Sequence, residues 1–215
     1  DQITVSGDVT ITGSVSASNN INTDGVYKID GNQVFAISGT STMVGRQAGG
    51  GSADNNTSVG YRALWKNTEG INNTAIGHNA GREGTTAYSN TAIGANALYS
   101  NTESIGNTSV GFYSLLALTD EGTTNTALGW GAGSSLEAGS NNVIIGMFAG
   151  SNITVGTGNI MIGSYTTPPS NDDVSNQLNI GNLIYGDLSK KLIGIGPSVP
   201  TEAKLEVTVS DEAYI

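Results

Sequence analysis

The sequence predicts an all-β protein, a β-solenoid of about eight coils with 17 residues each. A five-residue phrase such as NTAIG recurs along the chain, and its Thr, Val, Ile and Gly residues form helices poorly. Seventeen residues are also too few for two packed helices and their loops. The glycines that close the phrase are separated by 15, 17, 17, 17, 18, 17 and 17 residues, and they are Gly45, Gly60, Gly77, Gly94, Gly111, Gly129, Gly146 and Gly163.

Residues 1–40 are expected to form a β-rich connector or shaft. Apolar residues alternate with Thr, Ser and Gly in the stretch ITVSGDVTITGSVSAS, which is the period of a strand. The pair Asp30–Gly31 stands between two apolar stretches and predicts a tight turn.

Residues 41–181 form the predicted repeat array. We expect each coil to hold two short strands and two turns, with the central apolar residue of the phrase pointing inward and asparagines stacked in ladders. An alanine four residues after that position is expected where only a small side chain fits. The inward residues would include Ile76, Ile93, Val110 and Leu128, and the alanines are Ala63, Ala80, Ala97, Ala132 and Ala149.

The array is interrupted near its end. Pro168 and Pro169 cannot sit inside a strand ladder, so a loop is expected at about residues 165–176. Residues 182–215 then form a C-terminal β connector that ends in an alternating, strand-like stretch.

Composition limits the possible functions. The chain has no cysteine, which excludes disulfides, thiolate metal sites and cysteine nucleophiles. Its net charge is −10, and no Lys or Arg occurs from Glu83 to Ser189. Such a chain should repel phosphate backbones and anionic lipids, so neither nucleic acid nor membrane insertion is expected. Neutral sugars, proteins and cation-bridged ligands are the candidate partners.

No residue stands out as catalytic, cofactor-binding or metal-binding. His78 is the only histidine, and a zinc site or a catalytic triad needs more partners than this chain offers, so a structural or surface role is expected. Among the acidic pairs, Asp120–Glu121, Asp172–Asp173 and Asp211–Glu212, none has EF-hand spacing. Solvated loops explain them, with Asp172–Asp173 the best candidate for a cation.

Aromatic residues are the candidate receptor contacts. Exposed aromatic rings beside polar side chains commonly bind sugars or proteins, although the same rings could pack between subunits. The candidates share a repeat phase or lie near turns, and they are Tyr61, Trp65, Tyr88, Tyr99, Phe112, Tyr113, Trp130 and Tyr165.

One copy of the chain has a thin predicted core. Each coil buries about one large apolar residue, worth about 1.5–3 kcal/mol, whereas ordering its residues costs roughly 1.5 kcal/mol each. Association around a symmetry axis would bury a second face, which favours a cyclic homo-oligomer.

The repeat resembles the head repeat of trimeric autotransporter adhesins, the YadA-like head, over residues 41–181. This resemblance implies a left-handed parallel β-roll in a homotrimer. The phrase LIGIGPSVPTEAKLEV resembles one in phage tail fibres that often precedes an intramolecular chaperone, and TDGVYKIDGNQVF resembles another tail-fibre segment.

Together these features favour a non-enzymatic fibre module of a phage or phage-like tail, located on a virion tail or extracellular particle. It would join other tail or fibre proteins and attach to a host surface glycan or protein. One alternative is the head of an autotransporter-type adhesin on a bacterial cell surface. Another is a glycan-degrading tail spike, which would need paired carboxylates in a groove, and the acids here are sparse and out of phase.

Overall fold

The computed structural model describes residues 26–29, 32–38, 40–51, 53–168, 174–196 and 205–207. The alternating stretch expected before residue 26, the turn at Asp30–Gly31 and the acidic pairs Asp172–Asp173 and Asp211–Glu212 lie outside these residues. So do Pro169 and residues 197–204 and 208–215 of the C-terminal connector.

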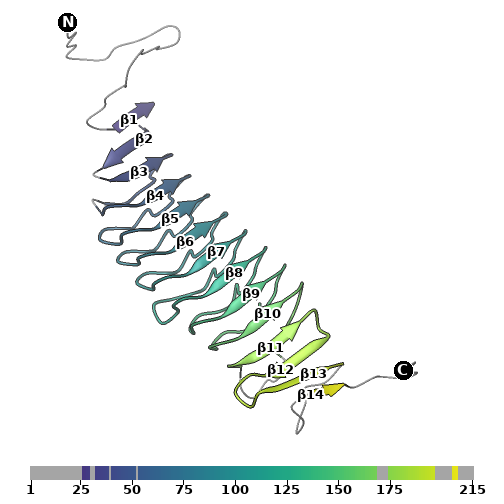
Figure 1. Ribbon diagram of the computed structural model, residues 1–215. Helices are drawn as coiled ribbons and strands as arrows, with labels where there is room; N and C mark the ends of the chain where they lie inside the picture. Colours follow the sequence, from purple (N-terminus) through teal and green to yellow (C-terminus); the bar gives the residue numbers. More distant parts are fainter. Residues whose placement is uncertain are drawn as a thin grey trace, which may run out of the picture.

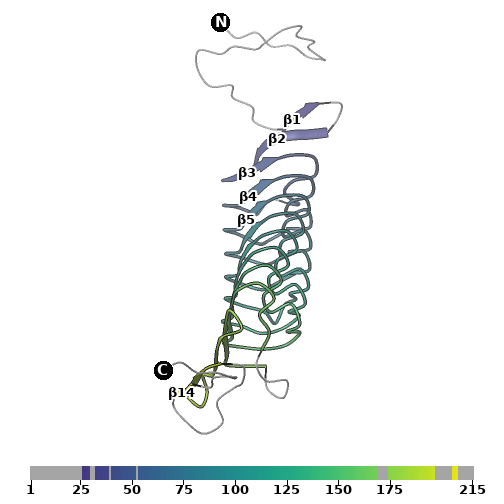
Figure 2. The same ribbon diagram turned by 90° about the vertical axis from the view of Figure 1, so that its right-hand side faces the viewer.

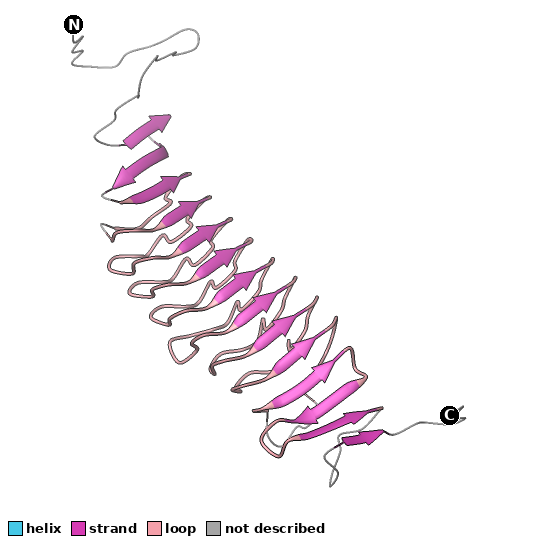
Figure 3. Cartoon of the chain, viewed as in Figure 1, coloured by secondary structure: helices cyan, strands magenta, loops and turns pink. Residues whose placement is uncertain are grey.

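The described residues form one sheet of fourteen strands and contain no helix (Figures 1 and 3). The strands follow one another in chain order, so that each pairs with its neighbours in the sequence. They are β1 (Val26–Ile29), β2 (Asn32–Ser38), β3 (Ser41–Val44), β4 (Thr57–Val59), β5 (Thr74–Ile76), β6 (Thr91–Ile93), β7 (Thr108–Val110), β8 (Thr126–Leu128), β9 (Val143–Ile145), β10 (Ile160–Ile162), β11 (Gln177–Ile180), β12 (Ile184–Asp187), β13 (Leu192–Ile195) and β14 (Leu205–Val207).

The middle of the chain is a parallel β-solenoid of about eight turns. Strands β3 to β11 all pair in parallel, and equivalent residues lie in register, as in Thr57 opposite Thr74 and Thr74 opposite Thr91. The strands stack in one column, and the turns of successive coils stack beside it (Figure 2). At roughly 4.8 Å per strand, eight coils make a rod on the order of 40 Å long.

Each coil contains one three-residue strand rather than the two strands that the sequence suggested. The second half of the coil leaves strand conformation because its residues adopt positive φ, as Asn96 (56°) and Leu98 (50°) do. Hydrogen bonds between coils continue there without a strand, since the amide of Leu98 donates to the carbonyl of Ser114 over 3.1 Å.

The prediction that the central apolar residue points inward is wrong. The residue before it faces the interior, and Ala75 and Ala92 are 0% and 2% exposed. The central residues face outward instead: Ile76 and Leu128 are 39% and 48% exposed, while Ile93 and Val110 are half-buried. Side chains alternate along a strand, so a buried asparagine at its start places the third and not the fourth residue of the phrase inside.

The core is formed by the third residue of each phrase together with the turn that follows it. The five predicted alanines are all fully buried, as expected for positions with little room. The next position holds either leucine or glycine, and the two complement each other between coils. A Cβ added to Gly81 would lie 3.0 Å from a methyl carbon of Leu64, and one added to Gly133 would lie 3.0 Å from a methyl carbon of Leu115. Leucine on one coil therefore fills the space that glycine leaves on another.

Asparagines form the ladder that the sequence suggested. The side-chain oxygen of each phrase asparagine accepts the amide N–H of the next, over 2.8–3.1 Å. In all of them except Asn159 the amide nitrogen donates to a turn carbonyl, for example from Asn107 to Gly122 over 2.8 Å. The ladder consists of Asn56, Asn73, Asn90, Asn107, Asn125, Asn142 and Asn159, which are at most 6% exposed. Because these polar groups are buried, each bond that they make prevents an unpaired group in the core.

The glycines that close the phrase stack backbone on backbone. Gly94 has φ of +129°, and a Cβ at this position would lie 2.5 Å from the carbonyl oxygen of Gly111. Both the conformation and the close approach exclude other residues, which explains why glycine recurs at this position.

After the solenoid the chain changes to antiparallel pairing. β11, β12 and β13 form a meander, and β14 lies parallel to β13. Asp187 closes the turn after β12 by accepting the amide N–H groups of Ser189 (3.0 Å) and Lys190 (3.1 Å). Hydrogen bonds from the side chains of Lys190 and Ser189 lower the pKa of Asp187 to about 2.

We predict that Gly94→Ala strongly destabilises the fold. The added Cβ would meet the Gly111 carbonyl at 2.5 Å, and overpacking together with unfavourable φ costs about 3 kcal/mol or more. Gly181→Ala is the control, because Gly181 also has positive φ (+62°) but nothing lies within 4 Å of its Cβ position. Urea denaturation at one protein concentration measures both. Equal losses for the two variants would contradict the stacked-glycine argument.

We also predict that Asn107→Ala lowers the free energy of unfolding by about 3 kcal/mol. The substitution leaves the Asn125 amide and the Gly122 carbonyl without their partner in the core, and each costs about 1–3 kcal/mol. Asn152→Ala changes an exposed asparagine outside the ladder and should shift stability by less than about 0.5 kcal/mol. A small effect of Asn107→Ala in the same denaturation assay would mean that the ladder is dispensable.

Candidate functional site

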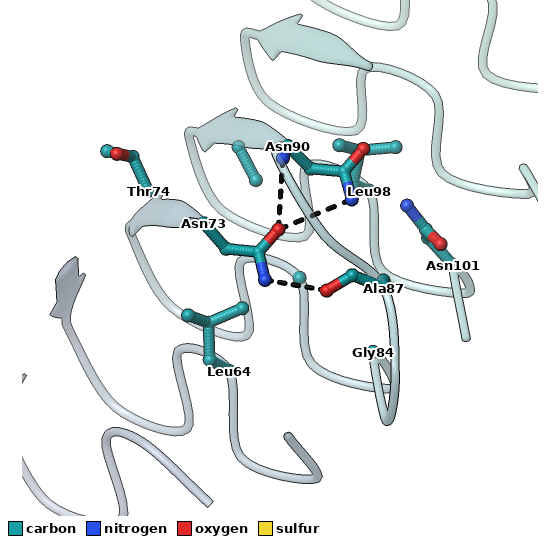
Figure 4. A pocket seen from close by; sticks show the side chains of 10 residues that line it. Leu64, Asn73, Thr74, Gly84, Ala87, Asn90, Leu98 and Asn101 are labelled. Atoms are coloured by element: carbon teal, nitrogen blue, oxygen red, sulfur yellow. Dashed lines mark hydrogen bonds between the residues drawn. The ribbon is translucent and has the colours of Figure 1, made fainter. Parts of the chain in front are cut away.

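The interior of the solenoid offers no room for a ligand at its best-formed cavity. This cavity lies between coils and is lined by Leu64, Asn73, Ala92 and Leu98 among others, with a volume of about 10 Å³. That is the space of a single water molecule. Figure 4 shows Asn73 there, bonded to Ala87 and Asn90 of the ladder. The polar groups of Asn73 are thus used in hydrogen bonds within the solenoid. The candidate binding surfaces therefore lie on the outside of the rod.

The first candidate surface is the outer face of the parallel sheet. The second and fourth residues of each phrase point outward, and they form a column of mostly threonine beside a column of branched apolar residues. We call these two columns the outer sheet face. Its apolar column is half-buried or exposed in a single chain, and it consists of Val44, Val59, Ile76, Ile93, Val110, Leu128, Ile145 and Ile162.

The second candidate surface is a stripe of aromatic rings. The stacked glycines turn the chain after each strand, so the next two residues of successive coils lie above one another. In the later coils at least one of these two residues is aromatic. Trp130 lies 6.1 Å from Phe112 and 5.5 Å from Phe148, and Phe148 stacks on Tyr165 at 5.6 Å between centroids. We call Phe112, Tyr113, Trp130, Phe148 and Tyr165 the aromatic stripe.

The stripe is open to solvent in the single chain. Trp130 and Tyr165 are 52% and 57% exposed, and Phe112 and Tyr113 are also exposed. The ring centroids of Phe112 and Tyr113 are only 3.9 Å apart. The stripe is therefore a continuous apolar surface with phenol hydroxyls beside it, a composition that suits contact with sugars or proteins.

The third candidate surface alternates cations with aromatic rings on the early coils. The guanidinium of Arg62 lies 4.8 Å from the ring centroids of both Tyr61 and Trp65. Arg46 lies 4.7 Å from the Tyr61 ring. Arg82 lies 4.8 Å from Trp65 and 5.3 Å from Tyr99. We call Arg46, Tyr61, Arg62, Trp65, Arg82 and Tyr99 the cation–aromatic cluster.

The members of this cluster differ in their charge partners. Arg82 forms an ion pair with Glu83, and Glu83 also pairs with Lys66. The Arg82 guanidinium donates a hydrogen bond to the Tyr99 hydroxyl. Arg62 donates from Nε to the side-chain oxygen of Gln47 over 2.7 Å. Neither Arg46 nor Arg62 forms an ion pair with any described carboxylate. Their positive charge is thus uncompensated within the described part of the chain.

Seven of the eight aromatic residues predicted as receptor contacts belong to these two groups. Tyr61, Trp65 and Tyr99 lie half-buried in the cation–aromatic cluster, whereas Phe112, Tyr113, Trp130 and Tyr165 lie in the aromatic stripe. Tyr88 stands apart on another side of the coil, where it is 43% exposed and bridges to Ile105.

Sequence reasoning missed Phe148 and the arginines. Phe148 occupies the second position after Gly146, the phase that Tyr113 and Tyr165 occupy after their own glycines, so the repeat itself carried the signal. His78 is exposed and stacks on Tyr61 at 5.4 Å, with an angle of 23° between the rings.

The acidic pair Asp120–Glu121 is exposed in a turn. Asp120 is exposed, accepts the hydroxyl of Thr102 and receives the Glu103 amide over 3.2 Å. Within the part of the chain that the structure describes, no three His, Cys, Asp or Glu side chains gather as they would around a metal ion.

Comparison of the chain with protein-family profiles, with curated proteins and with solved structures found no match. None of the described residues belongs to a helix of the length and apolarity that a membrane crossing requires.

We predict that the aromatic stripe stays open in the assembled protein. Trp65 and Trp130 are the only tryptophans, so in Trp65→Phe the emission reports on Trp130 alone. Acrylamide should quench this emission strongly, because half of the Trp130 surface is exposed in the single chain (52%). Unfolded protein in urea sets the upper limit of quenching. Protection of Trp130 at concentrations where the protein is oligomeric would show that the stripe packs between subunits.

Proposed function

We propose that this chain is a structural and receptor-binding fibre module of a phage or phage-like tail, which assembles as a homotrimeric, left-handed β-roll and attaches the particle to a host cell. The observation that carries the proposal is the outer sheet face. A column of valine, isoleucine and leucine runs along the whole solenoid and points away from the buried core of its coils.

An apolar column of this length favours association with copies of the same chain. Leu128 and Ile76 keep 48% and 39% of their surface exposed, and complete burial of such a side chain contributes about 1.5–3 kcal/mol. The column repeats from coil to coil, so a partner of the same repeat matches it along the full length. Three copies around an axis parallel to the rod would bury all three faces and leave no open one.

The geometry also fits attachment. A rod with an aromatic stripe along several coils presents the same kind of contact repeatedly, and three chains multiply it again. Weak contacts of this sort gain overall affinity through their number rather than their individual strength. Sugars and proteins on a host surface are the ligands that such a stripe suits.

An adhesin head of the autotransporter kind would use the same outer sheet face and the same stripe. The end of the array favours the fibre. The phrase LIGI that resembles tail-fibre sequence forms β13, and Ile193 of this strand pairs with Leu205 in the second half of the same phrase. The two strands of this tail-fibre-like phrase therefore pair with each other after the solenoid, which supports the fibre as the first choice.

We predict a trimer in solution with a mass of about 66 kDa, three times the chain mass of 21.9 kDa. Leu128→Glu places a charge on the outer sheet face and should reduce the mass to that of one chain, because burying an unpaired carboxylate is costly. Light scattering coupled to gel filtration measures both. The matched control is Ile71→Glu, which changes an exposed isoleucine (42%) outside the sheet and should remain trimeric.

A monomeric wild-type chain, or equal masses for the two glutamate variants, would contradict the proposed assembly. Attachment is tested separately with labelled trimer on a panel of bacterial strains. Saturable binding to particular strains, weakened in Leu128→Glu through loss of avidity, is expected. A stable trimer that binds no strain would leave only the structural part of the proposal.

A further inference from the structure

The cation–aromatic cluster gathers positive charge on an otherwise acidic chain. The chain has eight Lys and Arg residues against 18 Asp and Glu, and four of the eight cations fall between Arg46 and Arg82. In the described contacts these four cations meet a single carboxylate, that of Glu83. The early coils therefore carry a local positive charge that the net charge of −10 conceals.

The aromatic rings hold the guanidinium groups in place. Tyr61 lies between Arg46 on one side and His78 on the other, and Arg82 lies between Trp65 and Tyr99. A guanidinium that stacks on a ring keeps its N–H bonds in its own plane, away from the ring face. An arginine held in this way loses little conformational freedom when it binds an anion, and its paired N–H groups fit the two oxygens of a carboxylate or sulfate.

Two of the four cations, Arg46 and Arg62, meet no described carboxylate and are available to a ligand. Arg46 is exposed and Arg62 is half-buried. Glu83 engages both Lys66 and Arg82, and the Arg82 guanidinium also hydrogen-bonds the Tyr99 hydroxyl. Arg46 and Arg62 lie on successive coils, and both guanidinium groups contact the Tyr61 ring. The cluster therefore offers anion contacts at the spacing of the coils, about 4.8 Å from one strand to the next.

We propose that this cluster binds an anionic polysaccharide, with Arg46 and Arg62 contacting its carboxylate or sulfate groups. The inference rests on the proposed function, since it names the class of receptor that the fibre would recognise. Tyr61 and Trp65 act as positioning residues that fix the guanidinium planes. Charged sugar units along a chain can meet successive coils, so one polysaccharide would contact both arginines at once.

A nucleic acid fits this surface less well. Each strand carries a phosphate about every 3.4 Å, and binding draws on a long positive track. Here the positive region ends at Arg82, and the following coils carry no Lys or Arg as far as Ser189. A polyanion of high charge density would be repelled beyond the cluster. A polysaccharide with one carboxylate per sugar, such as polygalacturonate, is less densely charged, and its uncharged ring faces can also pack against aromatic groups.

The test measures binding of the full chain to fluorescein-labelled polygalacturonate and to heparin by fluorescence anisotropy, with labelled dextran as the neutral polymer. We expect the chain to bind polygalacturonate, heparin or both, and to bind dextran much more weakly. The preference between the two distinguishes carboxylate from sulfate. Binding should weaken as salt rises through about 0.15 M, because exposed charges are then screened.

The decisive variant is Arg62→Gln, which should weaken binding about tenfold or more through loss of charge-assisted hydrogen bonds. Lys191→Gln removes one exposed positive charge far along the chain, beyond β12, and should bind as the unmodified protein does. Arg62→Lys keeps the charge without the planar donor pair and should bind with intermediate affinity. Circular dichroism and the solution mass show whether each variant keeps its fold and assembly.

Several results would overturn the inference. They are no binding to either anionic polymer, equal binding to dextran, equal losses in Arg62→Gln and Lys191→Gln, or tighter binding to an oligothymidine strand than to both polysaccharides. These outcomes leave the proposed function standing, since that function fails on a monomeric chain or on absent cell attachment. A trimer that attaches to cells but ignores anionic sugars would separate the two.

Discussion

A buried hydrogen bond from one asparagine to the next is the interaction on which the rest of this structure depends. The side-chain oxygen of a phrase asparagine accepts the backbone N–H of the next one, and its amide nitrogen donates to a turn carbonyl, as Asn107 does with Asn125 and Gly122. Because that side chain must lie inside, the alternation of the strand is decided at its first residue. The third residue then faces the core and the branched fourth residue faces outward, which gives the solenoid its thin interior and its apolar exterior.

This division explains how one short repeat supports both assembly and recognition. The strand supplies the outer sheet face, which we assign to contacts with further copies of the chain. The glycine that ends the strand turns the chain away from this face, since Gly94 packs backbone against Gly111. The residues after it lie on a separate surface. Side chains there can change from coil to coil without touching the asparagine ladder or the alanine core.

Much of the fold could be predicted from the repeat, but not which residues of each phrase face the interior. The recurrent glycines and the alanines such as Ala80 marked positions without space, and both inferences hold. Ile76 was expected inside because large apolar residues are usually buried. Asn73 lies inside instead, because its side chain makes hydrogen bonds there to the Asn90 amide and to the Ala87 carbonyl, and side chains alternate along the strand. The aromatic candidates followed from phase as well. The cation–aromatic cluster was not predicted, because the net charge of the whole chain conceals the cations that gather on the early coils.

The backbone at the recognition surface indicates which side chains the fold does not require. The second residue after each glycine has positive φ, a conformation that asparagine tolerates and that costs most other residues about 1–2 kcal/mol. Asn79 and Asn96 occupy this position cheaply, at 56° each. Arg62, Tyr113 and Phe148 occupy it at 56°, 60° and 52°, although asparagine would suffice for the turn. A strained residue at a position where asparagine would be unstrained indicates that its side chain serves binding rather than folding. These three residues belong to, or lie beside, the two surfaces to which we assign binding.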